Sequence, residues 1–271
     1  MIFADKLKAS ATNTNSLVCV GLDSDVEKLP AGVDQLAFNK AIVDATHDLV
    51  CAYKPNTAFY EAQGAEGIQV LKDTCDYIRS VAPEVLIILD AKRADIGNTN
   101  AGYVQFAYDY LGADAITLHP YLGSEALEPF LKRGDKGAII LCRTSNPGSG
   151  EFQDRPIDGH KLYEHVAKMV ANDWNGQQNC MLVVGATYPE EAARVRALVG
   201  DDVWFLVPGV GAQGGSVEAT MNAAQNSHGD GLIISSSRDI LFASSGSDFA
   251  EAARAKAETL RSEINTYRKG K

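Results

Sequence analysis

The sequence predicts an α/β fold, a (β/α)8 or TIM barrel that takes up residues 1–271 as one domain. Short runs rich in aliphatic and β-branched residues recur roughly every 30 residues, and stretches with helical periodicity lie between them. The runs are apolar throughout, which is typical of a parallel sheet buried on both faces. No internal repeat, low-complexity tract or linker rich in proline and serine divides the chain. Closure of eight β/α units into a barrel is the simplest arrangement, and a doubly wound open sheet is the alternative.

Strands and helices are expected to alternate along almost the whole chain. The eight predicted strands are Leu17–Leu22, Leu49–Tyr53, Val85–Leu89, Ala115–Leu118, Ala138–Cys142, Met181–Val184, Val203–Val207 and Leu232–Ile234. The helical stretches expected between them are Ala37–Val50, Ala62–Val81, Asn100–Leu111, Gly123–Lys132, Leu162–Asn172, Pro189–Val199 and Ser216–Gln225. A last helical segment, Asp248–Arg268, follows the eighth strand.

Charge and composition exclude several classes of function. The chain has 25 lysine and arginine residues against 35 aspartate and glutamate residues, a formal net charge of -10, whereas nonspecific nucleic-acid binders carry a basic excess. No apolar run approaches the roughly 18 residues of a membrane span, and the N-terminus lacks the apolar segment of a signal peptide. Five scattered cysteines without a CxxC pair indicate neither a disulfide framework nor structural zinc. We therefore expect a cytoplasmic protein with no nucleic-acid or membrane partner.

Charged residues follow the first three predicted strands, at the end of the barrel where active sites lie. Asp90 and Lys92 end the third run, and residues two apart on a strand project from the same face. Asp23 and Lys54 follow the first and second runs and should lie nearby. Neighbouring carboxylates keep Lys92 protonated, which makes it a poor nucleophile but a good proton donor. The alternative is an ion-pair network that only fills the mouth of the barrel.

A glycine-rich stretch after the seventh strand has the features of an anion-binding loop. Pro208–Gly215, with the sequence PGVGAQGG, can expose backbone amides, and loops at this position commonly bind phosphate in barrels. Arg238, after the eighth strand, offers a guanidinium fork that matches phosphate oxygens. The alternatives are a mobile turn and an arginine that pairs with Asp239.

The connection after the fifth strand, Thr144–Asp158, is the longest in the chain and is rich in turn-forming residues. A long loop at this end of a barrel is often functional, and a solvated surface excursion is the alternative. The contacts of this segment are not predicted from the sequence.

Several of these segments resemble the orotidine 5′-phosphate decarboxylase family, in its longer, bacterial-type branch. The run DAKRADIGNT is similar to that family's DxKxxDI signature, which related sugar-phosphate decarboxylases share. The segments SNPG and PGVGAQGG make the resemblance specific, and it spans Gly21–Ile240. The matching segments are Lys54–Asn56, Ala58–Glu61, Asp90–Thr99, Thr144–Gly148 and Pro208–Gly215.

The resemblance implies decarboxylation of orotidine 5′-monophosphate to uridine 5′-monophosphate, the last step of de novo UMP synthesis, with no metal and no organic cofactor. By the family's mechanism, Lys92 stabilises the carbanion at pyrimidine carbon six and then protonates it. Asp90 would lie against the substrate carboxylate, so that the mixed charges favour the transition state. Asp23 and Lys54 are similar to the residues that hold the ribose hydroxyls and complete the charged array.

The remaining implied contacts involve the two ends of the nucleotide. Ser145 is similar to the residue that binds the pyrimidine edge, and Pro208, Gln213 and Arg238 are similar to the residues around the phosphate. Asp239 places a carboxylate beside the phosphate arginine where a neutral residue is expected, so its side chain should point away from the site.

The resemblance also implies a homodimer in which Asp95, Ile96 and Thr99 enter the partner's site, Asp95 as a catalytic residue and Thr99 as a substrate-binding one. Three alternatives stay open. A metal-assisted keto-sugar-phosphate decarboxylase or aldolase would need a carboxylate-rich metal pocket, where this sequence places Lys54 and Lys92. Schiff-base chemistry at Lys92 is the second. The third is a noncatalytic nucleotide-binding barrel, against which the complete DxKxxD set argues.

Overall fold

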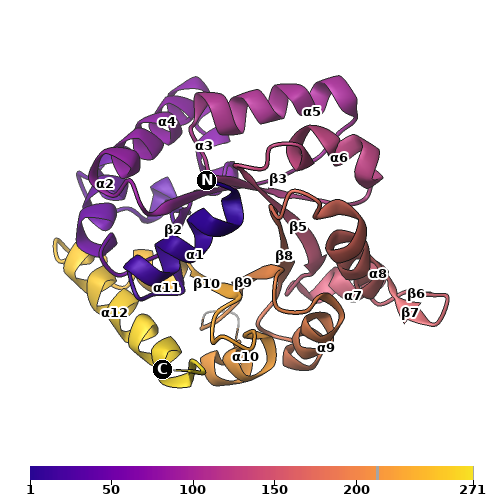
Figure 1. The fold of residues 1–271 in the computed structure, drawn as a ribbon. Helices are drawn as coiled ribbons and strands as arrows, with labels where there is room; N and C mark the ends of the chain where they lie inside the picture. Colours follow the sequence, from indigo (N-terminus) through magenta and orange to yellow (C-terminus); the bar gives the residue numbers. More distant parts are fainter. Residues whose placement is uncertain (212–213, 271) are drawn as a thin grey trace.

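The computed structural model describes residues 1–211 and 214–270, and it contains a closed barrel of eight parallel strands ringed by helices (Figure 1). Strand β10 pairs with β1 and closes the sheet, which confirms the predicted barrel and shows that the open-sheet alternative is wrong. In the order β1-β10-β9-β8-β5-β4-β3-β2, each strand is parallel to its neighbours. The strands are β1 (Val18–Gly21), β2 (Ala52–Lys54), β3 (Leu86–Arg93), β4 (Ala115–Leu118), β5 (Gly137–Arg143), β8 (Cys180–Val184), β9 (Trp204–Pro208) and β10 (Leu232–Ser236).

Each predicted strand overlaps an observed one, and the boundary differences have a physical reason. The second predicted strand begins at Leu49, whereas β2 begins at Ala52. Leu49 and Val50 are buried in the turn before the strand, so their apolar character reflects burial and not strand conformation. Burial of almost every strand residue explains why the runs do not alternate with polar residues.

The predicted helices form the outer ring of the barrel (Figure 1). The helix that follows β3 and the one that precedes β8 end in π-helical turns, η2 (Gln105–Tyr110) and η4 (Val170–Trp174). The first lies within its predicted stretch, and the second extends past the predicted end at Asn172. The α-helices of the ring are α2 (Gln35–Thr46), α4 (Gly64–Val81), α5 (Gly97–Val104), α6 (Gly123–Leu131), α8 (Leu162–Met169), α9 (Pro189–Val199), α10 (Val217–Ala224) and α12 (Phe249–Tyr267). Two short helices not predicted from the sequence are α3 (Ala58–Glu61) and α11 (Arg238–Leu241).

An N-terminal helix that the sequence did not predict, α1 (Phe3–Asn13), lies across one end of the barrel (Figure 1). Its Phe3 N–H donates to the carbonyl of Gly134, and its Ser10 hydroxyl donates to the carbonyl of Cys51 at 2.7 Å. These carbonyls precede β5 and β2, so α1 covers the N-terminal end of the strands. The Phe3 ring packs against Gly137, where a side chain would collide with it. The opposite end of the barrel is therefore the one available for a site.

The long connection after β5 contains regular structure and is not a bare loop. It folds into η3 (Pro147–Ser149), α7 (Gly150–Gln153) and a small antiparallel hairpin of β6 (Pro156–Ile157) and β7 (His160–Lys161). The hairpin projects away from the barrel (Figure 1). We refer to residues 144–161 below as the β5 segment.

All five cysteines are free and buried, and a buried free thiol packs as a small core residue. Burial raises the pKa of the thiols, to about 12 at Cys19, Cys75, Cys142 and Cys180. Within residues 1–211 and 214–270, no helix combines the length and the apolar character needed to cross a membrane.

The packing of α1 gives a prediction about stability. Phe3 is 1% exposed, and Phe3→Ala should lower the free energy of unfolding by about 3 kcal/mol because it leaves a cavity under the barrel. Denaturant unfolding followed by circular dichroism measures this change. Phe152→Ala is the control, because Phe152 is 69% exposed in the β5 segment. Equal effects of the two substitutions would show that α1 does not stabilise the barrel.

Candidate active site

A cavity of about 850 Å³ opens among the C-terminal ends of the strands, opposite α1. Its walls come from the last residues of β2, β3, β5, β8, β9 and β10 and from residues that follow β1, β2, β5, β9 and β10. Seven residues predicted for the site line it together: Asp23, Lys54, Asp90, Lys92, Ser145, Pro208 and Arg238. The structure thus brings together charged groups that lie far apart in the sequence.

The carboxylate of Asp90 is the centre of the charged group. One of its oxygens accepts from Lys54 Nζ at 2.9 Å, and the other accepts from Lys92 Nζ at 2.6 Å. The hydroxyl of Thr117, from β4, donates to that second oxygen at 2.8 Å. Asp90 is only 8% exposed, so these three donors replace most of its hydration.

The charges stabilise one another against burial. Burial alone would raise the pKa of Asp90, but Lys54 and Lys92 hold it well below its usual range. Burial alone would lower the pKa of Lys54, but Asp90 and then Asp23 hold it above the usual value for lysine. At neutral pH the site therefore contains an ionised carboxylate beside a permanently protonated ammonium group.

Asp23 is held more loosely than Asp90. Its Oδ1 lies 3.9 Å from Lys54 Nζ, and that atom is buried without a hydrogen bond from the described residues. A carboxylate oxygen that faces a cavity and lacks a donor is suited to accept a hydroxyl group of a ligand. Asp23 therefore has an oxygen without a donor, whereas both oxygens of Asp90 already accept hydrogen bonds.

Lys92 reaches Asp90 through an irregular backbone and not through ordinary strand alternation. The pairing of β3 with β4 shifts register between Leu89 and Arg93, and Lys92 has a φ of 45°, in the left-handed region. Its N–H donates to Thr117 Oγ1 at 2.9 Å, which holds this backbone in place. The predicted meeting of Asp90 and Lys92 is confirmed, but its cause is this bulge. The Lys92 side chain is 51% exposed and so faces the cavity.

The opposite wall of the cavity comes from the ends of β9 and β10. It comprises Pro208–Val210 and Ser235–Asp239. Gly209 has a φ of 96°, a backbone that favours glycine. Arg238 is exposed at the start of α11, and Asp239 also lines the cavity, so the expectation that Asp239 points away is not supported. Gln213, predicted to contact phosphate, lies outside the described residues.

The three residues expected to act in a partner's site do not line this chain's cavity. The carboxylate of Asp95 accepts from the N–H of Ile96 at 2.7 Å, and Ile96 is 59% exposed. Thr99 is exposed at the start of α5. The buried Asn100 fixes this turn, because its side chain bonds both the N–H and the carbonyl of Asp95.

The structure also brings to the site polar residues that the site prediction omitted. Asn56 and Gln153 line the cavity, and Thr117 bonds both Asp90 and Lys92. The sequence offered a reason to include Thr117, because it is the polar residue in an otherwise apolar strand. It offered one for Asn56 as well, because Asn56 ends the same polar run as Lys54. The sequence offered no reason to include Gln153, since its place depends on how the β5 segment folds.

No group of three or more histidine, cysteine, aspartate or glutamate side chains that could hold a metal ion occurs among the residues that the structure describes.

Comparison with known proteins gives a consistent result. A family model described as Orotidine 5'-phosphate decarboxylase / HUMPS family matches residues 16–255. Orotidine 5'-phosphate decarboxylase of Cellvibrio japonicus (strain Ueda107) is 51% identical over 275 residues, which cover 99% of this chain and 100% of the relative. The same-named protein of Azoarcus sp. (strain BH72) is 50% identical, with 99% and 100% covered. Among solved structures, Leishmania donovani OMP decarboxylase superposes with a TM-score of 0.86 at 39% identity, covering 98% of this chain and 99% of that one.

The low pKa of Asp90 predicts how stability depends on pH. Because the folded pKa lies below the usual value, the stability that ionised Asp90 contributes is fully present above about pH 5 and is lost as pH falls through the folded pKa. Asp90→Asn should lower the free energy of unfolding by about 3 kcal/mol at neutral pH, since it leaves Lys54 buried without its partner. The difference from the unaltered protein should shrink as pH falls from about 5 to about 3.

Denaturant unfolding at a series of pH values measures this difference. Asp25→Asn is the control, because Lys28 lowers the pKa of Asp25 at the protein surface, where the pair contributes little. A penalty for Asp90→Asn that stays constant from neutral to acid pH would contradict the role assigned to the buried charges.

Proposed function

The chain belongs to the orotidine 5′-phosphate decarboxylase / HUMPS family, and from that membership we propose that it is a carboxy-lyase that converts orotidine 5′-monophosphate to uridine 5′-monophosphate. This is the last step of de novo UMP synthesis. The observation that carries the proposal is an ionised Asp90, held between Lys54 and Lys92 in the wall of the cavity. The names of relatives about half identical to this chain favour this reaction over the keto-sugar-phosphate alternative.

In the proposed step, the substrate carboxylate at pyrimidine carbon six lies against Asp90. The bond from carbon six to the carboxylate carbon breaks, carbon dioxide leaves, and the electron pair stays on carbon six. The Lys92 ammonium faces this carbanion and donates a proton to it. Two like charges in the ground state give way to a carbanion beside an ammonium group, so the fixed charges favour the transition state. The exposed Lys92 then regains a proton from solvent.

The ammonium of Lys92 supplies the stabilising charge in this scheme, so we propose a reaction without a metal or organic cofactor. Asp23, whose Oδ1 has no hydrogen-bond donor among the described residues, accepts from the ribose hydroxyls, and the Lys54 ammonium donates to them. The base edge contacts Ser145, whose side chain packs so closely on Gly185 that a Cβ there would lie 2.7 Å from Ser145 Cβ. The phosphate lies between Pro208 and Arg238, with Gln213 as a further ligand.

We propose that the active form is a homodimer in which Asp95, Ile96 and Thr99 complete the partner's site. Ile96 follows β3, and the next strand is followed by Tyr121 and Leu122, which are 85% and 44% exposed. Exposed apolar side chains on neighbouring loops are typical of an interaction surface. The buried free thiols support a reducing, cytoplasmic location.

The role of Lys92 is tested by following the absorbance loss of orotidine 5′-monophosphate. Lys92→Ala should reduce kcat by at least about 10³-fold, because the carbanion loses both its counter-charge and its proton donor. Lys8→Ala, on the exposed face of α1, is the control and should be unchanged. An inactive unaltered protein would overturn the proposed function, and an active Lys92→Ala would overturn the role of Lys92 alone.

The dimer is tested by subunit mixing. Lys92→Ala and Asp95→Ala homodimers should each be nearly inactive. After random exchange, each mixed dimer contains one site with both native residues, so about a quarter of the wild-type activity should return. Failure to recover activity in a mixture shown to contain heterodimers would contradict Asp95 acting in the partner's site.

A further inference from the structure

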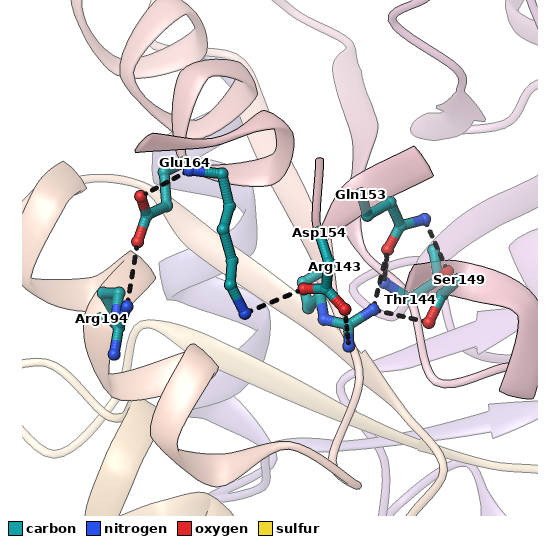
Figure 2. Close-up of polar contacts among 8 residues, drawn as sticks. Arg143, Thr144, Ser149, Gln153, Asp154, Glu164 and Arg194 are labelled. Carbon is teal, nitrogen blue, oxygen red and sulfur yellow. Dashed lines mark hydrogen bonds and ion pairs between the residues drawn. The ribbon is translucent and has the colours of Figure 1, made fainter. Parts of the chain in front are cut away.

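A buried guanidinium group at the end of β5 ties the β5 segment to the barrel (Figure 2). Arg143 is 3% exposed, and its Nη1 donates to the hydroxyl of Ser149 at 2.5 Å. The same fork lies 3.4 Å from Gln153 Oε1 and 3.4 Å from Asp154 Oδ2. All three acceptors belong to the β5 segment, so one side chain gathers both η3 and α7.

Aromatic rings fix Arg143 from the other side. Its guanidinium carbon lies 4.1 Å from the centre of the Tyr188 ring, just before α9, and 5.9 Å from that of Tyr163 in α8. A cation in contact with an aromatic ring keeps its charge stabilised after it leaves water. The rings therefore fix the position of Arg143, and its hydrogen bonds fix Ser149, Gln153 and Asp154 relative to the barrel.

Gln153 connects Arg143 to Thr144 in the wall of the cavity. Its Oε1 accepts from the N–H of Thr144 at 2.9 Å, and its Nε2 donates to the hydroxyl of Thr144 at 2.8 Å. That hydroxyl lies 2.6 Å from Asn146 Oδ1. Ser145 stands between these two residues, so the amide of Gln153 holds the backbone on which Ser145 is carried. Gln153 itself lines the cavity.

Two ion pairs and a backbone hydrogen bond between them hold the far end of the β5 segment (Figure 2). Asp154 pairs with Lys161 Nζ at 3.1 Å, and the N–H of Lys161 donates to Glu164 at 3.0 Å. Glu164 in turn lies 3.4 Å from Arg194 of α9. The segment is thus attached at both ends, through contacts that do not involve the opposite wall of the cavity, residues 208–210 and 235–239.

We propose that Arg143 and Gln153 are positioning residues that set the affinity for the pyrimidine base without affecting affinity for the phosphate. The inference rests on the proposed function. Arg143 places Gln153, Gln153 places the backbone of Thr144 and Ser145, and Ser145 meets the base edge. A correctly seated base also directs the carboxylate towards Asp90, so loss of the pair raises KM for the substrate.

The test compares two ligands that differ only in the base: uridine 5′-monophosphate and ribose 5-phosphate. Calorimetry gives Kd for each, with the unaltered protein and with Arg143→Met and Gln153→Met. Loss of one or two hydrogen bonds in the wall that contacts the base should raise Kd for uridine 5′-monophosphate roughly 10-fold. Kd for ribose 5-phosphate should change less than about 2-fold. KM for orotidine 5′-monophosphate should rise in parallel.

Arg196→Met is the matched control. Arg196 is also buried and stacked on a ring, 3.9 Å from the centre of Phe205, but it donates to the carbonyls of Val203 and Gly231 at the other end of the barrel. This variant should be less stable without discriminating between the ligands. Gln153→Met removes only a half-buried amide, so it provides the test even where Arg143→Met does not fold.

The outcomes separate the two proposals. If the unaltered protein neither binds uridine 5′-monophosphate nor decarboxylates the substrate, the proposed function is wrong. If it does both, and Gln153→Met raises Kd for the two ligands equally or for neither, the positioning role is wrong. Selective loss of base affinity, absent in Arg196→Met, supports it.

Discussion

Asp90 carries a full negative charge in a place where water hardly reaches it, and the site depends on how that charge is stabilised. Lys54 and Lys92 bind its two oxygens from different sides, and Thr117 adds a hydroxyl. An isolated ion so buried would take up a proton, because desolvation penalises the charged form. The strand ends must therefore hold the two ammonium groups in place, and the closed barrel supplies that rigidity.

The same arrangement explains why an unfavourable backbone persists at Lys92. A left-handed φ at a residue other than glycine costs of order 1–3 kcal/mol and survives only where surrounding contacts enforce it. Here the contacts are the hydrogen bond from Lys92 N to Thr117 and the ion pair with Asp90. The strain places an ammonium group against a carboxylate and leaves it facing the cavity. In the proposed reaction, the protein thus gives up some stability to fix its proton donor before substrate arrives.

Sequence reasoning predicts this fold well because strand burial and helix periodicity are local signals, and they placed all eight strands and the charged residues that follow them. It predicts less where structure depends on contacts between distant segments. The bulge in β3 arises from its register with β4, and α1 is held by carbonyls more than a hundred residues away in one case. Gln153 lines the cavity from the β5 segment, whose contacts with the buried Arg143 are not readable from the sequence. Asp239 lines the cavity from the first turn of α11, a helix that the sequence did not indicate.

The cavity is built from two walls on different parts of the sheet, with β8 between β5 and β9. The wall after β5 is carried by an inserted segment with its own hydrogen bonds, whereas the wall after β9 and β10 is part of the barrel rim. Because different parts of the chain form the two walls, one wall can change while the other stays the same. Changes in length or sequence within residues 144–161 can alter the ligand group accepted at that wall, while the charged centre and the rim proposed to bind phosphate stay unaltered. Specificity can therefore diverge by a route that leaves the proposed chemistry intact.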